Sequence, residues 1–390
     1  MMKQHIFDYS PRGSGSILLS LTFILLTAIG CTTEDAMNNQ TTSEEDGNEV
    51  IIEIGEDATR GAYVEGKDLL KYGVYSFYSD TKKMYLNNSI LTRAKAGDAW
   101  KKSKAIKYPN ATRALDFYAL APEFSGSLVT ESYMKPELKY IVHTLPTTNA
   151  KQTDFLFSSL MGATQTKNKV IKFNFKHLFV YLRFNAKLNN EKIDVVVHSI
   201  KLHNLKSTGK FTMDNDKANT GSWTLDDVYA DYEFVLPKDS SLVNKKTLTL
   251  HKTDSLLFVM PQNPTLFKFV EGSNSFSDAD DAKEAYASLM VKIKNKETGD
   301  YIGPCSDTTY AEVYYPIKSA SWITAKQPFG ASKTVSIEFT GGFTKEGNDY
   351  LKEYSDDADM ENTSVEGVQG GVYSTEDWVD DTDNSVTITL

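Results

Sequence analysis

Cysteine is scarce in this chain, whose 390 residues include only Cys31 and Cys305. A disulfide framework like that of small secreted domains is therefore excluded, and stability has to come from packing and strand pairing. Basic residues are also outnumbered, because 42 Lys and Arg face 52 Asp and Glu and the formal net charge is −10. An acidic surface repels phosphate backbones, so we expect no nucleic acid partner.

The sequence also lacks the motifs that mark familiar catalytic and metal sites. It contains no His-Glu-x-x-His, no Gly-x-Ser-x-Gly and no phosphate-binding glycine loop, and its six histidines are scattered. The acidic stretches 214–216 and 356–361 lack the glycine and the terminal glutamate of a calcium loop, and the isolated Cys305 argues against zinc. We therefore predict no enzyme activity, no catalytic residue, no metal and no cofactor.

One long hydrophobic run is present, residues 17–31 (ILLSLTFILLTAIGC), and Lys3 and Arg12 precede it. Its apolar part has the length of a signal-peptide core and is too short to span a bilayer comfortably. It ends in small residues and Cys31, as a bacterial lipobox does, although Ala28 stands where leucine is usual. We expect residues 1–31 to be a lipoprotein signal peptide with its lipidated Cys31, which would carry palmitate. The alternative is an ordinary signal peptide with an incidental cysteine.

A polar, acidic segment, 32–48, follows and is predicted to be a flexible tether because it has no aromatic residue to bury. Three branched aliphatic residues then occupy alternate positions: Val50, Ile52 and Ile54. Alternation at period two places them on one face of a strand. Arg60 and Gly61 come soon afterwards in a polar, turn-like stretch, which is a plausible site for a trypsin-like protease. The alternative is that Arg60 is an ordinary loop arginine.

Aromatic residues are abundant in the rest of the chain, with 21 Tyr and 20 Phe, and they favour strands. Short alternating segments with the spacing of a β-sandwich occur at 72–78, 84–91, 115–122, 139–145 and 155–161. The window 278–289 is the one good helical pattern, because acids open it and alanines fill its middle. The pattern predicts an all-β protein with one short helix in its second half.

The strongest strand signal is residues 170–188 (VIKFNFKHLFVYLRFNAKL). The alternation changes phase around Lys176 and His177, which predicts a β-bulge or a bend at that point. A lone histidine among strand aromatics is more often a hydrogen-bonded structural residue than a ligand or catalyst, so we interpret His177 as structural.

The chain closes on an acidic, irregular stretch and then a final strand, 385–390. Three aliphatic residues again occupy alternate positions on one face: Val386, Ile388 and Leu390. This spacing matches that of Val50, Ile52 and Ile54. The two strands therefore carry interchangeable apolar faces.

The chain resembles the fimbrillin family of Bacteroidales. The motifs that carry the resemblance are FNFKHLFVYLRF at 173–184, LDFYALAP at 115–122, LLFVMPQ at 256–262 and AEVYYPIKSASW at 311–322. The resemblance implies two transthyretin-like Greek-key β-sandwich domains in tandem. We place them at 49–165 and 166–390, with the short helix and a C-terminal donor strand in the second domain.

The resemblance also implies how such a subunit matures. Fimbrillins are exported as lipoproteins and clipped after an arginine by a trypsin-like, Arg-specific protease, which here falls between Arg60 and Gly61. The clip removes the strand of Val50, Ile52 and Ile54. The implied donor strand carries Val386, Ile388 and Leu390 into the next subunit. The partners are then other fimbrial subunits, the protease and the cell outer membrane, which the lipid on Cys31 would reach.

Strand replacement of this kind has a physical basis in the sequence itself. Pairing an open sheet edge adds main-chain hydrogen bonds, and a head-to-tail contact that does not close makes a filament. We therefore predict a structural subunit of a surface-exposed fimbria that supports adhesion. The alternative is a glycan-binding surface lipoprotein of the outer membrane, in which exposed tryptophans form a sugar platform.

Overall fold

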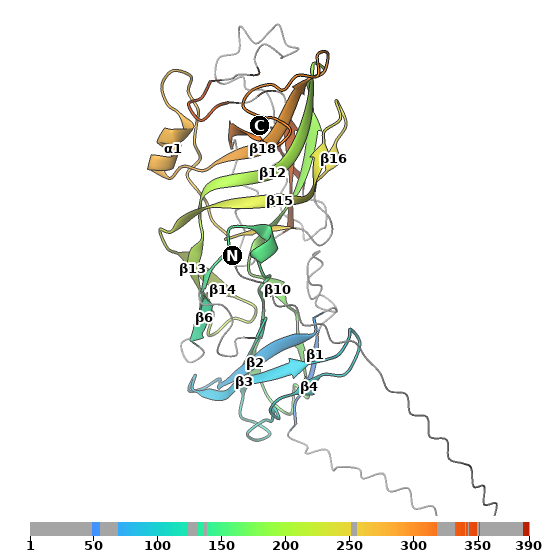
Figure 1. The fold of residues 1–390 in the computed structure, drawn as a ribbon. Helices are drawn as coiled ribbons and strands as arrows, with labels where there is room; N and C mark the ends of the chain where they lie inside the picture. The colour runs from blue at the N-terminus through green and yellow to red at the C-terminus, as the bar shows by residue number, and fades with distance from the viewer. Residues whose placement is uncertain are drawn as a thin grey trace, which may run out of the picture. The chain divides into compact units, whose positions relative to one another are not determined.

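The computed structural model describes residues 49–54, 69–123, 132–135, 139–250, 256–317, 332–339, 341, 343–348, 351 and 385–389 (Figure 1). The fold is all-β, as the sequence predicts, with α1 (Phe276–Ala282) as the one α-helix in these residues. A short 3-10 turn, η3, covers Asn149–Lys151. The tandem transthyretin-like arrangement stays a prediction.

Two sheets and one strand pair contain the first ten described strands of the chain, together with β13 and β14. A six-stranded antiparallel sheet has the order β10 (Lys176–His177), β8 (Leu156–Ala163), β5 (Leu115–Ala121), β2 (Lys71–Tyr78), β3 (Met84–Thr92) and β4 (Lys101–Lys102). A four-stranded sheet has the order β14 (Gly221–Leu225), β13 (Thr208–Met213), β7 (Tyr140–Thr144) and β6 (Ser132–Lys135). The pair consists of β1 (Ile51–Ile54) and β9 (Val170–Phe173), which run parallel.

Two further sheets complete the described strands. A five-stranded sheet has the order β16 (Leu248–Thr249), β11 (Val180–Leu188), β20 (Ser332–Phe339) and β21 (Ser385–Thr389), and β17 (Leu257–Val259) also pairs with β11. A second four-stranded sheet has the order β15 (Tyr229–Ser241), β12 (Ile193–Lys206), β18 (Tyr286–Asn295) and β19 (Ala311–Pro316). Within the five-stranded sheet, β20 runs parallel to both β11 and β21.

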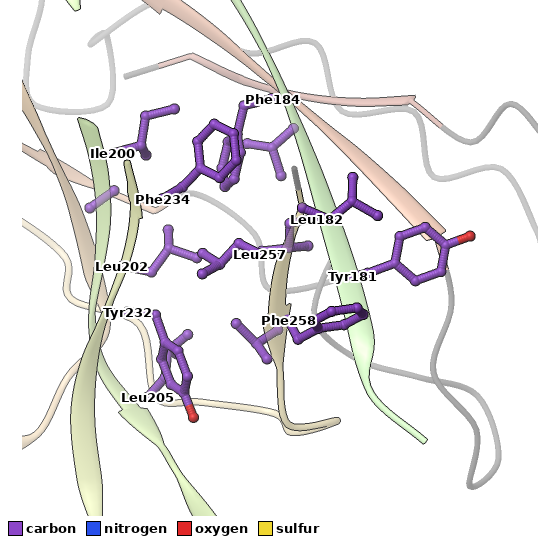
Figure 2. Close-up of a cluster of buried hydrophobic side chains, with 14 of the residues drawn as sticks. Tyr181, Leu182, Phe184, Ile200, Leu202, Leu205, Tyr232, Phe234, Leu257 and Phe258 are labelled. Atoms are coloured by element: carbon purple, nitrogen blue, oxygen red, sulfur yellow. The ribbon is translucent and has the colours of Figure 1, made fainter. Parts of the chain in front are cut away.

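The largest hydrophobic core lies between strands of these last two sheets. Figure 2 shows Leu182 of β11 close to Leu257 and Phe184 close to Phe234, with side chains of β12 and β15 opposite β11. The rings of Phe184 and Phe234 are 5.0 Å apart between centroids. The same core continues into buried residues before position 165, among them Phe77. The domain boundary at 165/166 therefore stays a prediction, and the apolar core is continuous across it.

The segment 170–188 changes sheets where the alternation changes phase. It forms β9 beside β1, then the two-residue β10 beside β8, and then β11 in the five-stranded sheet. The change is a break between strands rather than a single bulge, because each piece joins a different partner. His177 lies at the break and its Nδ1 is 2.6 Å from Oδ2 of buried Asp154. The structural interpretation of His177 is confirmed by this hydrogen bond.

The predicted helix is present but shorter than the window 278–289. A capping box fixes its start, because the Ser275 hydroxyl accepts from the Asp278 N–H and the Asp278 carboxylate accepts from the Ser275 N–H. Lys283 ends it in the left-handed conformation at φ 57°. The second half of the window belongs instead to β18, where pairing with β12 and β19 overrides the local helical pattern.

His143 of β7 is buried, and its surroundings favour the neutral imidazole. Its ring lies 4.5 Å from the Phe155 ring and 5.3 Å from the Phe179 ring, between centroids. Burial lowers the pKa of His143 to about 4. An imidazole in an apolar site of this kind resists protonation because the charged form would lose its hydration.

We expect the folded state to lose stability in acid through His143. The unfolded chain takes up this proton near pH 6.5 and the folded chain only near the lowered pKa, so the loss begins below about pH 6.5 and is complete near pH 4. The cost is about 3 kcal/mol of unfolding free energy for a shift of this size. Urea titrations at several pH values, on the native chain and on His143→Phe, measure it. Parallel pH dependences for the two proteins would contradict the assignment.

Candidate functional site

The N-terminal strand β1 is seated in the fold with one face buried. Val50 is 0% exposed and Ile52 is 6% exposed, whereas Ile51 between them is 49% exposed. Ile54 is partly buried and packs against the same core as Val50 and Ile52. The alternation predicted from sequence is therefore present, and the aliphatic face is turned into the protein.

The backbone of β1 is held on both sides. On one side it runs parallel to β9, with Ile52 opposite Ile171 and Ile54 opposite Phe173. On the other side the Val50 N–H donates to the Ile106 carbonyl oxygen at 2.8 Å. The walls of the site, which we name the β1 groove, are thus β9 and the segment around Ile106.

Aromatic rings form the core beneath this strand. Tyr72 of β2 is the centre of the group, at 4.7 Å from Trp100, 5.2 Å from Phe175 and 6.2 Å from Phe173, between ring centroids. These edge-to-face contacts come from residues of β2, β9 and their neighbouring loops, and not from β1. Burial raises the pKa of the Tyr72 hydroxyl far above its usual range. The floor of the groove is therefore apolar, and its aromatic rings come from residues outside β1.

Two lysines, which the sequence reading did not single out, fix the polar edges of β1. The Lys102 ammonium donates to the Val50 carbonyl oxygen at 2.6 Å and to Glu49 Oε1 at 2.8 Å. Lys172, directly across from Glu53 in the register, lies 3.4 Å from its carboxylate. The Lys102 side chain is largely buried although Glu49 is half exposed, whereas both partners of the Lys172–Glu53 pair are exposed and this pair contributes little. The signal in the sequence was the pair Glu49 and Glu53, which mark the ends of the strand.

The C-terminal strand β21 occupies the edge of the five-stranded sheet. Its backbone runs parallel to β20, with Val386 opposite Val335 and Ile388 opposite Ile337. The structure does not bring β21 and β1 together, since they belong to different sheets. Both terminal strands share one feature, which is that each runs parallel to the described strand with which it pairs.

Several predicted site residues lie outside the described residues. They are Cys31, Arg60, Gly61 and Leu390. Lipidation at Cys31 and cleavage between Arg60 and Gly61 thus stay predictions.

The described tryptophans do not form an exposed platform for a sugar. Trp100 packs against Tyr72, and the guanidinium of Arg93 lies 4.4 Å from the centroid of its ring. Trp223 packs against the largest core, and its indole N–H donates to the Leu178 carbonyl oxygen at 3.0 Å. Both are packing residues in the part of the chain that the structure covers.

The acidic loop at 214–216 is already neutralised by two lysines. Lys82 donates to the Asn215 carbonyl oxygen at 2.7 Å and lies 3.3 Å from the Asp216 carboxylate. Lys139 donates to the Asn215 side-chain oxygen at 2.8 Å. No group of acids, histidines and cysteines with the arrangement of a metal site occurs among the described residues.

One arrangement has the order of a Ser-His-Asp triad but lacks an accessible nucleophile. His203 Nε2 is 2.8 Å from Ser288 Oγ, and His203 Nδ1 is 3.1 Å from the Asp231 carboxylate. Ser288 is 0% exposed, and its hydroxyl donates to Glu312 at 2.7 Å instead of to the imidazole. A substrate carbonyl has no route to this oxygen, so we interpret the group as a structural network between strands.

No helix among the residues described here is both long and apolar enough to cross a membrane.

The structure is thus an all-β protein whose N-terminal strand, β1, lies in the β1 groove and pairs with β9. Residues 59–278, more than half of the chain, match the fimbrillin-like family. The chain belongs to this family. None of the curated proteins matches it.

The comparison with solved structures found proteins from species of Bacteroides. A fimbrial protein from Bacteroides vulgatus is 14% identical, with a TM-score of 0.46 over 75% of this chain and 95% of that chain. A protein described as a candidate cell adhesion protein from Bacteroides uniformis is also 14% identical, with a TM-score of 0.40 over 75% of this chain and 94% of that chain.

We expect the two faces of β1 to differ sharply in what they contribute. Ile52→Ser removes a buried aliphatic side chain and should weaken the seating of β1 by about 1.5–3 kcal/mol. Ile51→Ser, the matched control on the exposed face, should change it by less than about 0.5 kcal/mol. Hydrogen exchange of the amides of residues 50–54 reports the opening of this strand directly. Equal effects of the two substitutions would show that the groove does not hold β1 by its apolar face.

Proposed function

We propose that this protein is a structural subunit of a cell-surface fimbria, assembled by strand exchange at the β1 groove and supporting adhesion. The observation that carries the proposal is the seating of β1, a four-residue strand with buried aliphatic side chains that, among the described strands, pairs with β9 alone. Membership of the fimbrillin-like family supports the same role. In this proposal β1 occupies the groove until the terminal strand of another subunit replaces it.

The energetics of β1 suit a removable occupant. Burial of Val50 and Ile52 contributes about 3–6 kcal/mol, at ~1.5–3 kcal/mol for each side chain. While the chain is intact, β1 is covalently tethered near its groove. It therefore competes with the strands of other subunits at a high effective concentration. A cut between Arg60 and Gly61 would end that advantage and leave β1 held by its own contacts alone. The vacated groove would present an apolar floor and the unpaired edge of β9, which is a template for strand addition.

The proposed donor is the C-terminal strand of a second subunit. With Val386 in the position of Val50, Ile388 takes the position of Ile52 and Leu390 that of Ile54. The donor must first leave the edge of β20, so donation gives up one set of edge pairs and gains another together with an apolar groove. Since each subunit offers a strand and a groove at different places, the contact does not close and a filament results.

The proposal includes the maturation steps expected from the sequence. Export with lipidation at Cys31 would place the precursor on the cell outer membrane, and an Arg-specific protease would release β1 at the surface. Of the two sandwich domains, 49–165 and 166–390, the first would contribute β1, Tyr72 and the segment around Ile106 to the groove, and the second would contribute β9 and the donor strand. The product would be a homo- or heteropolymer of fimbrial subunits.

Cleavage at Arg60 should convert the protein from monomers into polymers. After limited digestion with an Arg-specific protease we expect a new N-terminus at Gly61 and a ladder on an unboiled gel. Arg60→Gln should abolish both, whereas Arg113→Gln, at an exposed arginine beside Asp80, should leave both unchanged. Ile388→Ser should permit the cut but suppress the ladder. A native chain that is cut at Arg60 and stays monomeric would refute strand exchange.

A further inference from the structure

Four lysines lie next to β1, two through side-chain contacts and two through backbone contacts, in a chain whose net charge is −10. The Lys102 ammonium contacts Glu49 and the Val50 carbonyl, and the backbone of Lys107 pairs with that of Glu49. The carbonyl oxygen of Lys169 accepts the Ile51 N–H at 3.1 Å, and Lys172 lies across from Glu53. We name Lys102, Lys107, Lys169 and Lys172 the lysine frame.

The frame is uneven along the strand. Lys102, Lys107 and Lys169 all lie at the end where β1 begins, and only Lys172 lies near the end where it finishes. A strand that enters the groove in the direction of β1 therefore brings its preceding residues to the three-lysine end. A strand that enters in the opposite direction brings them to the end that has one.

Acids precede both terminal strands in the sequence. Glu44 and Glu45 lie six and five positions before Val50, and Asp380 and Asp381 lie six and five positions before Val386. The C-terminal leader is the more acidic, since five of the eight residues 376–383 are Asp or Glu. The two segments share one charge pattern, which is acids first and alternating aliphatics afterwards.

We propose that the lysine frame recognises the acidic residues 376–383 of a second copy of this chain and directs its terminal strand into the groove parallel to β9. This inference rests on the proposed function and names what selects and orients the donor. Exposed opposite charges act mainly on the rate of encounter and on direction, and less on final affinity. A strand that enters in the opposite direction would bring these acids to the end of the groove that has only Lys172.

The charge contribution has a defined salt dependence. Attraction across several ångströms is effective at low ionic strength, where the screening length is about 30 Å at 0.01 M, and is lost where it falls to about 3 Å at 1 M. Burial of the aliphatic side chains has no comparable sensitivity to screening. Association rates at the two salt concentrations therefore distinguish the contribution of the lysine frame from that of apolar burial in the groove.

The test uses the full chain cut by an Arg-specific protease, and labelled peptides of residues 376–390 as probes. One peptide has the native sequence, and the other has its five acids replaced by the corresponding amides. We expect the native peptide to associate about tenfold faster at low salt and at an equal rate near 1 M salt. The comparison uses one protein, so the folding of a variant does not enter it.

Protein variants provide the reciprocal measurement. Lys107→Glu with Lys169→Glu should slow the native peptide at low salt by about the same factor. The matched control is Lys238→Glu with Lys296→Glu, at exposed lysines of β15 and of the turn after β18, which changes the net charge equally and should have no effect. Equal rates for the two peptides at low salt would overturn the role of the frame while leaving strand exchange intact. If neither peptide binds at any salt concentration, both proposals fail.

Discussion

The segment 170–188 is the constraint on which the other elements depend. Its first part, β9, supplies the edge with which β1 pairs, its middle part joins the six-stranded sheet through β10, and its last part, β11, enters the five-stranded sheet. The hydrogen bond between His177 and Asp154 holds the bend between these parts inside the protein. A single run of aromatic and aliphatic residues thus fixes the groove and the main core at once. Ile171 and Phe173 of β9 are buried, so side-chain packing also holds β9 in place.

The β1 groove has a floor of aromatic rings, and in the proposed exchange the strand that covers this floor is replaced. Tyr72, Phe173 and Phe175 contact one another without the help of β1, whereas Val50 and Ile52 add apolar area on top of them. Side-chain packing gives the affinity, and main-chain pairing to β9 gives the direction. Because the pairing partners are backbone groups, any strand with the right alternation satisfies them. Selectivity among strands must then come from charge or from the ends of the strand.

Local sequence patterns predicted where strands and helices occur better than they predicted which strands pair with one another. The alternation of Val50, Ile52 and Ile54 gave the buried face of β1, and the phase change at His177 gave the bend, because both depend on neighbours along the chain. The parallel pairing of β1 with β9 was not predictable, since the two are more than a hundred residues apart and no local signal records it. The lysine frame was missed for the same reason, because Lys102 and Lys172 meet β1 only after folding. The helix was predicted to be too long, because the second half of its window pairs within a sheet as part of β18.

The parallel edge pairing of β21 with β20 has a consequence for fibres. If assembly proceeds as proposed, every subunit that donates its last strand uncovers the β20 edge, so a filament would carry one open edge for each repeat along its length. Such edges invite sideways association with a neighbouring fibre, and native proteins commonly guard them with charge. Lys333 and Glu338 are the charged residues in the β20 sequence. Bundling of the filaments would then be governed by two side chains that take no part in their elongation.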